Sequence, residues 1–263
     1  MQMSGNTVLI TGGAAGIGFE LASRLTALGN TVMITSRDQA RLDAARSRLP
    51  ALRTFVLDIS DPADIARLSE EVTAVAPALN ILINNAGIMR TINLNESPAD
   101  VAALTSEVDT NLSGTIRMVS LFLPHLSRQR SAAIVNVSSG AAFMPIPITP
   151  IYCASKAGLH SYTLSLRAQL KHTPVRVYEL MPPTTQTPLL DSFDNRDVKG
   201  ASIMPVEKMV DVAIKGLQAD RWEIRPGQTN QLRWMSRIAP RFIFTQLSKS
   251  VDGMLARSAA GRE

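Results

Sequence analysis

Short apolar segments rich in β-branched residues alternate along the chain with longer segments that have helical spacing. Six short segments predict buried strands, at residues 7–10, 31–34, 54–57, 81–83, 133–137 and 175–178. In two of the longer segments an apolar residue recurs every third or fourth position, at Ile17, Leu21, Leu25 and Leu28 and at Ile65, Leu68, Val72 and Val75. The repeated strand-helix-strand order predicts an α/β fold, a doubly wound parallel sheet with helices on both faces.

No linker, low-complexity stretch or internal repeat interrupts this alternation, so the sequence predicts a single domain over residues 1–263. The longest apolar runs are far shorter than the ~20 residues that cross a bilayer, so we expect no membrane span. The N-terminus has no basic segment followed by a long apolar one, as a secretory signal would. The lone Cys153 cannot form an internal disulfide, and the three histidines lack metal-binding spacing. We therefore expect no metal site and a cytoplasmic location.

The formal net charge of +5 comes from the C-terminal part of the chain. From Arg221 onward there are eight Lys and Arg residues against three Asp and Glu residues. Because the basic residues are scattered among Trp, Met, Ile and Phe, this basic C-terminal segment, residues 222–263, favours a solvated or interface-lining surface, and we expect no nucleic-acid partner. A helix lying on a membrane surface around Trp234 to Leu247 is another interpretation, because basic and bulky apolar residues alternate there.

A cluster of glycines, TGGAAGIG at residues 11–18, stands between the first predicted strand and the first predicted helix. The N-terminus of a helix offers free N–H groups and a partial positive charge to a pyrophosphate. Gly12 would permit the tight turn, and Gly16 and Gly18 would let the backbone approach a nucleotide and let the helix pack against the strand. The stretch therefore predicts the phosphate-binding corner of a Rossmann fold.

The spacing Thr-Gly-x3-Gly-Ile-Gly resembles the fingerprint of the short-chain dehydrogenase/reductase family. Further motifs follow in the order of that family: NNAG at residues 84–87, Asn111, IVNVSS at 134–139 and YCASK at 152–156. The stretch LMPPTTQT, the helix SYTLSLRAQLK before it and the basic C-terminal segment resemble the branch labelled DltE-like oxidoreductases. The resemblance implies that cofactor contacts also come from Ala15, Ile17, Asn85, Ala86, Gly87, Pro182 and Thr187.

The catalytic set that this resemblance implies is Asn111, Ser139, Tyr152 and Lys156. Tyr152 and Lys156 are four residues apart and share a helix face, so the ammonium is expected to lower the pKa of the phenol toward neutrality. Tyr152 would protonate a carbonyl oxygen during reduction, and Ser139 would hold that oxygen by a hydrogen bond. Ser139 is preferred to Ser138 because it lies thirteen residues before Tyr152, the usual separation in the family. Lys156 would also bind the nicotinamide ribose, and Asn111 would hold a water.

Each of these residues also has an ordinary structural interpretation. A Tyr and a Lys four residues apart occur on many helices, and an Asn often caps a turn. Their joint occurrence in one fold favours an enzyme, and an NADP(H)-binding regulatory protein with little turnover is the alternative.

The residues at the end of the second predicted strand, Thr35-Ser36-Arg37-Asp38, predict which cofactor is preferred. An acid there would bind ribose hydroxyls and repel a 2′-phosphate, whereas a basic residue attracts the phosphate. Ser36 stands where NAD-preferring relatives carry Asp, and Arg37 follows, so the sequence predicts NADP(H). Asp38 is expected to cap the next helix. Asp58 either contacts the adenine or caps the turn before Asp61.

Two apolar segments flank the predicted catalytic residues, at 143–148 and in a predicted flap at about 188–204 that contains Leu189, Leu190 and Phe193. They would suit a small apolar ketone or aldehyde as the carbonyl substrate, or its alcohol, or they could mainly pack against one another. Cys153 is expected to be structural. Pro183 replaces the glycine usual in the family, which would make that backbone less adaptable. The resemblance also implies a homodimer, or a homotetramer, paired through the helices that contain Asn111 and Tyr152.

Overall fold

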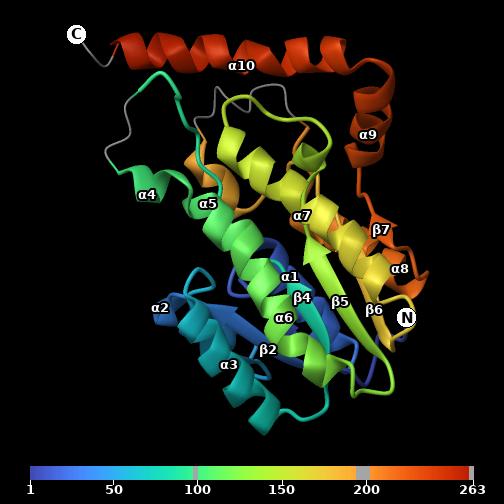
Figure 1. Ribbon diagram of the computed structural model, residues 1–263. Helices are drawn as coiled ribbons and strands as arrows, with labels where there is room; N and C mark the ends of the chain where they lie inside the picture. Colours follow the sequence, from blue (N-terminus) through green and yellow to red (C-terminus); the bar gives the residue numbers. More distant parts are fainter. Residues whose placement is uncertain (97–99, 194–201, 261–263) are drawn as a thin grey trace.

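The computed structural model describes residues 1–96, 100–193 and 202–260 (Figure 1). Its strands form one parallel sheet of seven in the order β3-β2-β1-β4-β5-β6-β7. They are β1 Thr7–Ile10, β2 Thr31–Ser36, β3 Arg53–Val56, β4 Leu79–Asn84, β5 Ala132–Val137, β6 Val175–Leu180 and β7 Glu223–Ile224. All six predicted strands are confirmed, as is the doubly wound fold. The sequence did not predict β7, whose two residues are too few to form an apolar run.

Ten α-helices are present in the described part of the chain. They are α1 Gly16–Ala27, α2 Gln39–Arg48, α3 Pro62–Val75, α4 Val101–Leu104, α5 Ser106–Val108, α6 Gly114–Leu126, α7 Pro150–Gln169, α8 Val206–Gln218, α9 Thr229–Ile238 and α10 Pro240–Ala260. A π-helical segment, η1 Asp109–Ser113, joins α5 to α6, and two short 3₁₀ turns are η2 Gly140–Ala142 and η3 Pro188–Ser192. None of the described helices combines the length and the apolar composition needed to cross a membrane.

The strands read as continuous apolar runs because each one has a hydrophobic core on both of its faces. Val8 and Ile10 enter the core beneath α1, α2 and α8, whereas Leu9 between them enters the core beneath α3, α6 and α7. The helices contribute their apolar stripes to these cores. Helices α3, α6 and α7 cover the near face of the sheet in Figure 1. Leu28 and Val75, predicted to extend two of the stripes, are exposed because they lie at helix ends.

The order of the sheet places a crevice at the carboxyl ends of β1 and β4. The chain leaves β1 toward β2 and β3 on one side and continues from β4 toward β7 on the other, so the connections diverge between β1 and β4. Ligands of open parallel sheets bind at such a switch point. Helix α10 lies across the end of the molecule toward which the strands point (Figure 1). The C-terminal helices therefore lie near the edge of the sheet where a ligand would bind.

Candidate active site

The glycine-rich turn has a geometry that side chains would obstruct. Gly12 and Gly16 have φ values of +64° and +53°, in the left-handed region that favours glycine. A Cβ on Gly18 would lie 2.3 Å from the carbonyl oxygen of Gly12. Ala15, at the N-cap of α1, gives no side-chain hydrogen bond to the first turn, and that turn has no acidic residue. An uncapped helix N-terminus beside backbone that side chains cannot cover fits a pyrophosphate.

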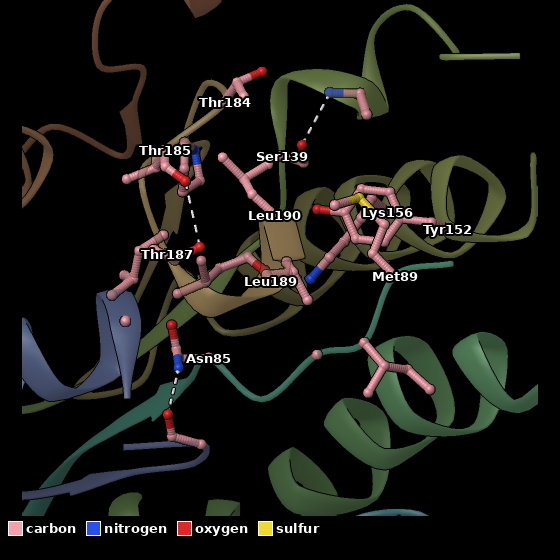
Figure 2. Close-up of a pocket in the computed structure, with 18 of the residues that line it drawn as sticks. Asn85, Met89, Ser139, Tyr152, Lys156, Thr184, Thr185, Thr187, Leu189 and Leu190 are labelled. Carbon is pink, nitrogen blue, oxygen red and sulfur yellow. Dashed lines mark hydrogen bonds between the residues drawn. The ribbon is translucent and has the colours of Figure 1, made fainter. Parts of the chain in front are cut away.

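The NNAG motif holds this turn in place. The Thr11 hydroxyl accepts hydrogen bonds from the backbone N–H groups of Asn85 and Ala86, at 3.0 and 3.1 Å. The amide of Asn85 donates to the Thr11 carbonyl at 3.1 Å and to the Gly12 carbonyl at 3.0 Å. Figure 2 shows one of these bonds as a dashed line from Asn85. Thr11 was not among the predicted site residues, although it directly precedes the glycines. The predicted Asn85 and Ala86 thus join the ends of β1 and β4 at the crevice.

Asn111 lies in η1 and is buried against the same motif. Its side-chain oxygen accepts from the Ile88 N–H at 2.8 Å, and its amide donates to the Ile88 carbonyl and the Ser155 hydroxyl at 2.9 and 3.0 Å. A Cβ on Gly87 would lie 3.2 Å from Asn111 Oδ1 and 3.5 Å from Lys156 Nζ. The Asn111 side chain therefore fixes the backbone at Ile88 beside Lys156, and its predicted role in holding a water stays a prediction.

The three other predicted catalytic residues line one cleft. Tyr152 and Lys156 come from the first turns of α7, and Ser139 follows β5. Figure 2 shows the three side chains gathered beside Leu189 and Leu190. The Ser139 hydroxyl accepts from the Ala141 N–H at 3.1 Å and lies near enough to the Tyr152 phenol to favour its charged form. This arrangement places a phenol, a hydroxyl and an amine where one substrate oxygen could meet the first two.

The pKa values of the phenol and the amine depart from the sequence-based expectation. Burial raises the pKa of Tyr152 to about 12, and the hydrogen bond with Ser139 opposes this only in part. Burial likewise lowers the pKa of Lys156 to about 8, although the carboxylate of Glu179 favours its charged form. Lys156 Nζ donates to the Val137 carbonyl at 2.9 Å and lies 5.8 Å from the Tyr152 ring centroid. The groups of the protein itself thus keep the phenol protonated, whereas the sequence predicted a lowered pKa for Tyr152.

Sequence reasoning missed a buried polar network behind the catalytic residues. The side chain of Glu179, on β6, has no exposed area. It accepts a hydrogen bond from the Ser138 hydroxyl at 2.6 Å, and its second oxygen lies 2.9 Å from His160 Nδ1. Ser138 also donates its backbone N–H to the Leu180 carbonyl at 2.9 Å. The sequence feature that could have indicated this network is the charged Glu179 between Tyr178 and Leu180, directly after a predicted buried strand.

Phe143, predicted to form part of the apolar wall, packs elsewhere. Its ring meets the edge of His160 with centroids 5.3 Å apart, and the guanidinium of Arg233 lies 5.3 Å from its centroid. Phe143 is not among the residues that line the cleft. It connects the loop after Ser139 to α7 and α9, and this contact could not be predicted because it depends on how α9 packs.

The adenosine end of the predicted cofactor site lies at the end of β2. Ser36, Arg37 and Asp58 all line the cleft there, together with the unpredicted Arg41. Asp38 caps α2 as expected, accepting from the backbone N–H groups of Ala40 and Arg41 at 2.9 and 3.3 Å. Asp38 also lines the cleft and pairs with Arg41 at 3.4 Å, so Arg37, which forms no ion pair with the described residues, is the guanidinium there that best suits a phosphate.

Asp58 makes the turn contacts of its structural interpretation. It accepts hydrogen bonds from the N–H and hydroxyl of Ser60 at 2.9 and 2.6 Å, and these bonds hold the pKa of its carboxyl below the usual range. Arg37 nearby lowers this pKa further. Asp61 rather than Asp58 caps α3. Because Asp58 also lines the cleft, a contact with adenine stays a prediction.

The substrate end of the cleft is predominantly apolar. The whole cleft has a volume of about 1280 Å³. Tyr152 and Met89 form a small cluster with Ala141 and Cys153, against which Leu189, Leu190 and Phe193 pack. Further lining comes from Met144, Ile146 and Ile148 and, from α9 and α10, Leu232 and Leu247. The apolar side chains therefore both pack together and face the cleft, and the apolar substrate stays a prediction.

The segment after β6 lies beside the glycine turn. The Pro182 carbonyl accepts from the Gly140 N–H at 3.0 Å, which ties this segment to the Ser139 loop. A Cβ on Gly16 would lie 3.2 Å from the Cβ of Thr187. Both Pro182 and Thr187 line the cleft, as does Pro183. Of the predicted flap at 188–204, residues 194–201 lie outside the described residues. At its start, Leu189 and Leu190 of η3 pack against the cluster that contains Met89 and Tyr152.

Cys153 is buried and has local partners. Its sulfur accepts from the Ile146 N–H at 3.2 Å and lies 3.5 Å from the Thr149 hydroxyl, and burial raises the pKa of the thiol. These contacts support the structural role predicted for it. The residues that the structure describes contain no group of three or more His, Cys, Asp and Glu side chains placed to hold a metal ion.

Comparisons with known proteins agree with this geometry. The family described as short chain dehydrogenase matches residues 6–197. The uncharacterized oxidoreductase DltE of Bacillus subtilis (strain 168) is 40% identical over 250 residues, which cover 94% of this chain and 98% of that protein. The 2-dehydro-3-deoxy-L-rhamnonate dehydrogenase (NAD(+)) of Sphingomonas sp. (strain SKA58) is 31% identical over 198 residues, covering 75% and 79%. Among solved structures, a short chain dehydrogenase from Burkholderia cenocepacia J2315 in complex with NADP has a TM-score of 0.81 at 25% identity, covering 94% of this chain and 99% of that chain.

Proposed function

Because the chain belongs to the short-chain dehydrogenase family and is an oxidoreductase similar to DltE, we propose that it interconverts a carbonyl compound and an alcohol with NADP(H). The observation that carries this proposal is the shared cleft. Ser139, Tyr152 and Lys156 line the same cleft as the glycine turn at Gly12 and Gly16. A dinucleotide bound at the turn could therefore extend to the phenol.

The residues that would hold the cofactor fall into three groups along the cleft. Backbone at Gly12, Gly16 and Ile17 suits the pyrophosphate, with Gly18 packed behind it, and Arg37 with Arg41 suits a 2′-phosphate. Asn85 to Gly87, Lys156 and Thr187 lie toward the catalytic end. A bound nicotinamide dinucleotide supplies the hydride for reduction and accepts it in oxidation.

The proton chemistry belongs to Tyr152. With a pKa of about 12, the phenol is protonated at neutral pH and is a donor to the substrate oxygen as negative charge develops on that oxygen. The Ser139 hydroxyl donates a second hydrogen bond to the same oxygen. After the transfer, the ammonium of Lys156 favours the phenolate until Tyr152 is protonated again from solvent. In oxidation the proton moves in the opposite direction, from the alcohol to the Tyr152 oxygen.

The proposed substrate is a small apolar ketone or aldehyde. Its apolar part would contact the side chains of Met89, Met144, Ile146, Leu189 and Leu190. NADPH oxidation measured against a panel of aldehydes, ketones and diketones tests this proposal. We expect turnover with apolar members of the panel. Cofactor binding without turnover on any member would contradict it and favour a regulatory protein.

The proposed preference for NADP(H) rests on this chain's own residues. The Sphingomonas relative is named as an NAD(+) enzyme and the Burkholderia structure holds NADP, so relatives differ in cofactor. Removing one charged phosphate contact costs about 1.5–3 kcal/mol. Replacing Arg37 by Ala is therefore expected to lower the ratio of kcat/KM for NADPH over NADH at least about tenfold. Arg46→Ala, on the exposed side of α2, is the matched control. An unchanged ratio in the Arg37 variant would refute the assignment.

For the assembly we propose a homodimer through α6 and α7, whose outward Leu121 and Leu164 are exposed large apolar residues. The proposed location is the cytoplasm, where a single buried thiol stays reduced.

A further inference from the structure

The two C-terminal helices expose large apolar side chains next to basic ones. Trp234 and Ile238 on α9 are 65% and 62% exposed, and Phe242 and Phe244 on α10 are 59% and 44% exposed. We call the surface formed by Trp234, Arg237, Ile238, Arg241, Phe242 and Phe244 the α9–α10 surface. Trp234 and Ile238 lie four residues apart and share one face of α9, and bulky apolar side chains exposed together in this way indicate a partner.

The charge of this surface has one sign. Between Glu223 and Asp252 the chain contains no acidic residue. Arg225 and Arg233 both pair with Glu223, whose single negative charge offsets one of their two positive charges. Arg237 and Arg241 are exposed and form no ion pair or side-chain hydrogen bond with the described residues. The α9–α10 surface therefore combines uncompensated positive charge with four bulky apolar side chains.

We propose that the α9–α10 surface binds the headgroup region of an anionic membrane. Basic side chains attract anionic lipids by about 1 kcal/mol, or fivefold, for each residue near the surface. Trp, Ile and Phe gain free energy by entering the boundary between headgroups and acyl chains, where Trp is especially favoured. Neither helix crosses the bilayer, so the proposal concerns binding to the surface of a membrane and not insertion through it.

The same features disfavour two other partners. A symmetric pairing of two copies through this surface would place Arg237 and Arg241 near their own counterparts, with no acidic residue on α9 or the first half of α10 to offset them. A nucleic acid would neutralise the two arginines, but Ile238 and Phe242 would gain little from a phosphate backbone. An anionic lipid surface satisfies both the charged and the apolar side chains.

The position of this surface relates it to the cleft. Leu232 of α9 and Leu247 of α10 line the cleft from the inner sides of the two helices that carry the α9–α10 surface. The two helices therefore join the α9–α10 surface to the cleft, and membrane binding at this surface does not depend on the proposed function.

The test uses the full chain and vesicles of phosphatidylcholine with or without phosphatidylglycerol. The chain has two tryptophans, so the Trp222→Phe variant makes Trp234 the only indole reporter. We expect this variant to float with the anionic vesicles at low salt, to shift its emission to shorter wavelength, and to be released by high salt. We expect it not to float with vesicles of phosphatidylcholine alone.

Charge variants separate the proposed surface from general attraction. Arg237→Glu with Arg241→Glu should weaken vesicle binding about 30-fold or more, because two favourable contacts are lost. Arg128→Glu with Arg130→Glu makes the same change in net charge near the start of β5 and should leave binding unchanged. Trp234→Ala with Phe242→Ala should also weaken flotation, without a change of charge.

Several results would overturn the proposal. The protein could fail to float with anionic vesicles, or the control pair Arg128→Glu and Arg130→Glu could weaken vesicle binding as much as the Arg237 and Arg241 variant does. A dimer that is lost in the Arg237 and Arg241 variant would point to pairing of two copies. Displacement of the protein from vesicles by DNA at equal phosphate concentration would point to a nucleic acid. Turnover with soluble substrates is measured in the same preparations. Absent vesicle binding with normal turnover would reject the surface and leave the proposed function intact, and the reverse result would reject the function alone.

Discussion

Ionisable residues around the cleft are buried at a cost to the stability of the fold. Lys156 is the clearest case, because its amine is inside the protein and its pKa falls to about 8. The sequence predicted a role for Lys156 from its spacing to Tyr152, and both residues line the cleft. The direction of both pKa shifts could not be predicted, because burial is set by chain segments distant in the sequence.

Replacing Lys156 by Met should stabilise the protein near neutral pH while removing activity. The folded-state pKa of about 8 lies below the ordinary 10.5, so the unfolded chain binds more protons between these values and wild-type stability rises with pH there. Below pH 8 the buried amine is charged and destabilises the fold by its full amount, so there the free energy of unfolding of the variant should exceed that of the wild type by up to about 3 kcal/mol. Urea unfolding between pH 7 and 10 should show this gain shrinking as pH rises. A gain independent of pH, or one shared by the exposed Lys171→Met control, would reject the explanation.

Glu179 should be important for stability, although it lies outside the predicted site. Glu179→Leu leaves the buried Ser138 hydroxyl without its acceptor and removes the partner of His160. An unsatisfied buried group costs about 1–3 kcal/mol, so a loss of this size in the free energy of unfolding is expected. Glu20→Leu, which breaks a partly exposed pair with Arg24, should cost about 1 kcal/mol or less. Equal losses in the two variants would contradict the role of the buried network.

At the level of elements, the apolar runs predicted the strands because each strand lies between two cores. Two elements that do not depend on an apolar run, β7 and η1, could not be predicted from the sequence. The two residues of β7 join the sheet through pairing with Glu179 and Leu180. The π-helical form of η1 was not visible in the motif around Asn111. The glycine turn was predictable because its residue types are required by its backbone.

The contact between α1 and the glycine turn gives a prediction at Gly18. In Gly18→Ala the new methyl group would meet the Gly12 carbonyl and the Asn85 amide, which must move apart. Overpacking of this kind costs about 1–3 kcal/mol and should also weaken cofactor binding, measured by fluorescence titration. Gly253→Ala on α10, where the methyl group has room, should leave binding unchanged. Wild-type cofactor affinity in the Gly18 variant would mean that the turn does not bind the pyrophosphate.

At the scale of the whole molecule, one cleft joins residues from the first strand to the last helix. The motifs predicted residues for cofactor binding and catalysis, and the glycine turn, the NNAG motif and Ser139 lie in this cleft at the carboxyl ends of β1, β4 and β5. The motifs could not predict that α9 and α10 also line the cleft. The basic C-terminal segment therefore has two sides, with Leu232 and Leu247 toward the cleft and the α9–α10 surface toward solvent.

The most direct test of the proposed chemistry is turnover by Tyr152→Phe, measured as NADPH oxidation with the best carbonyl substrate of the panel. Loss of a positioned proton donor should reduce kcat by about 10²–10⁴-fold. Cofactor affinity from fluorescence should stay close to that of the unaltered protein, because the pyrophosphate and 2′-phosphate contacts are intact. Full turnover with normal cofactor binding would show that the phenol is not the proton donor.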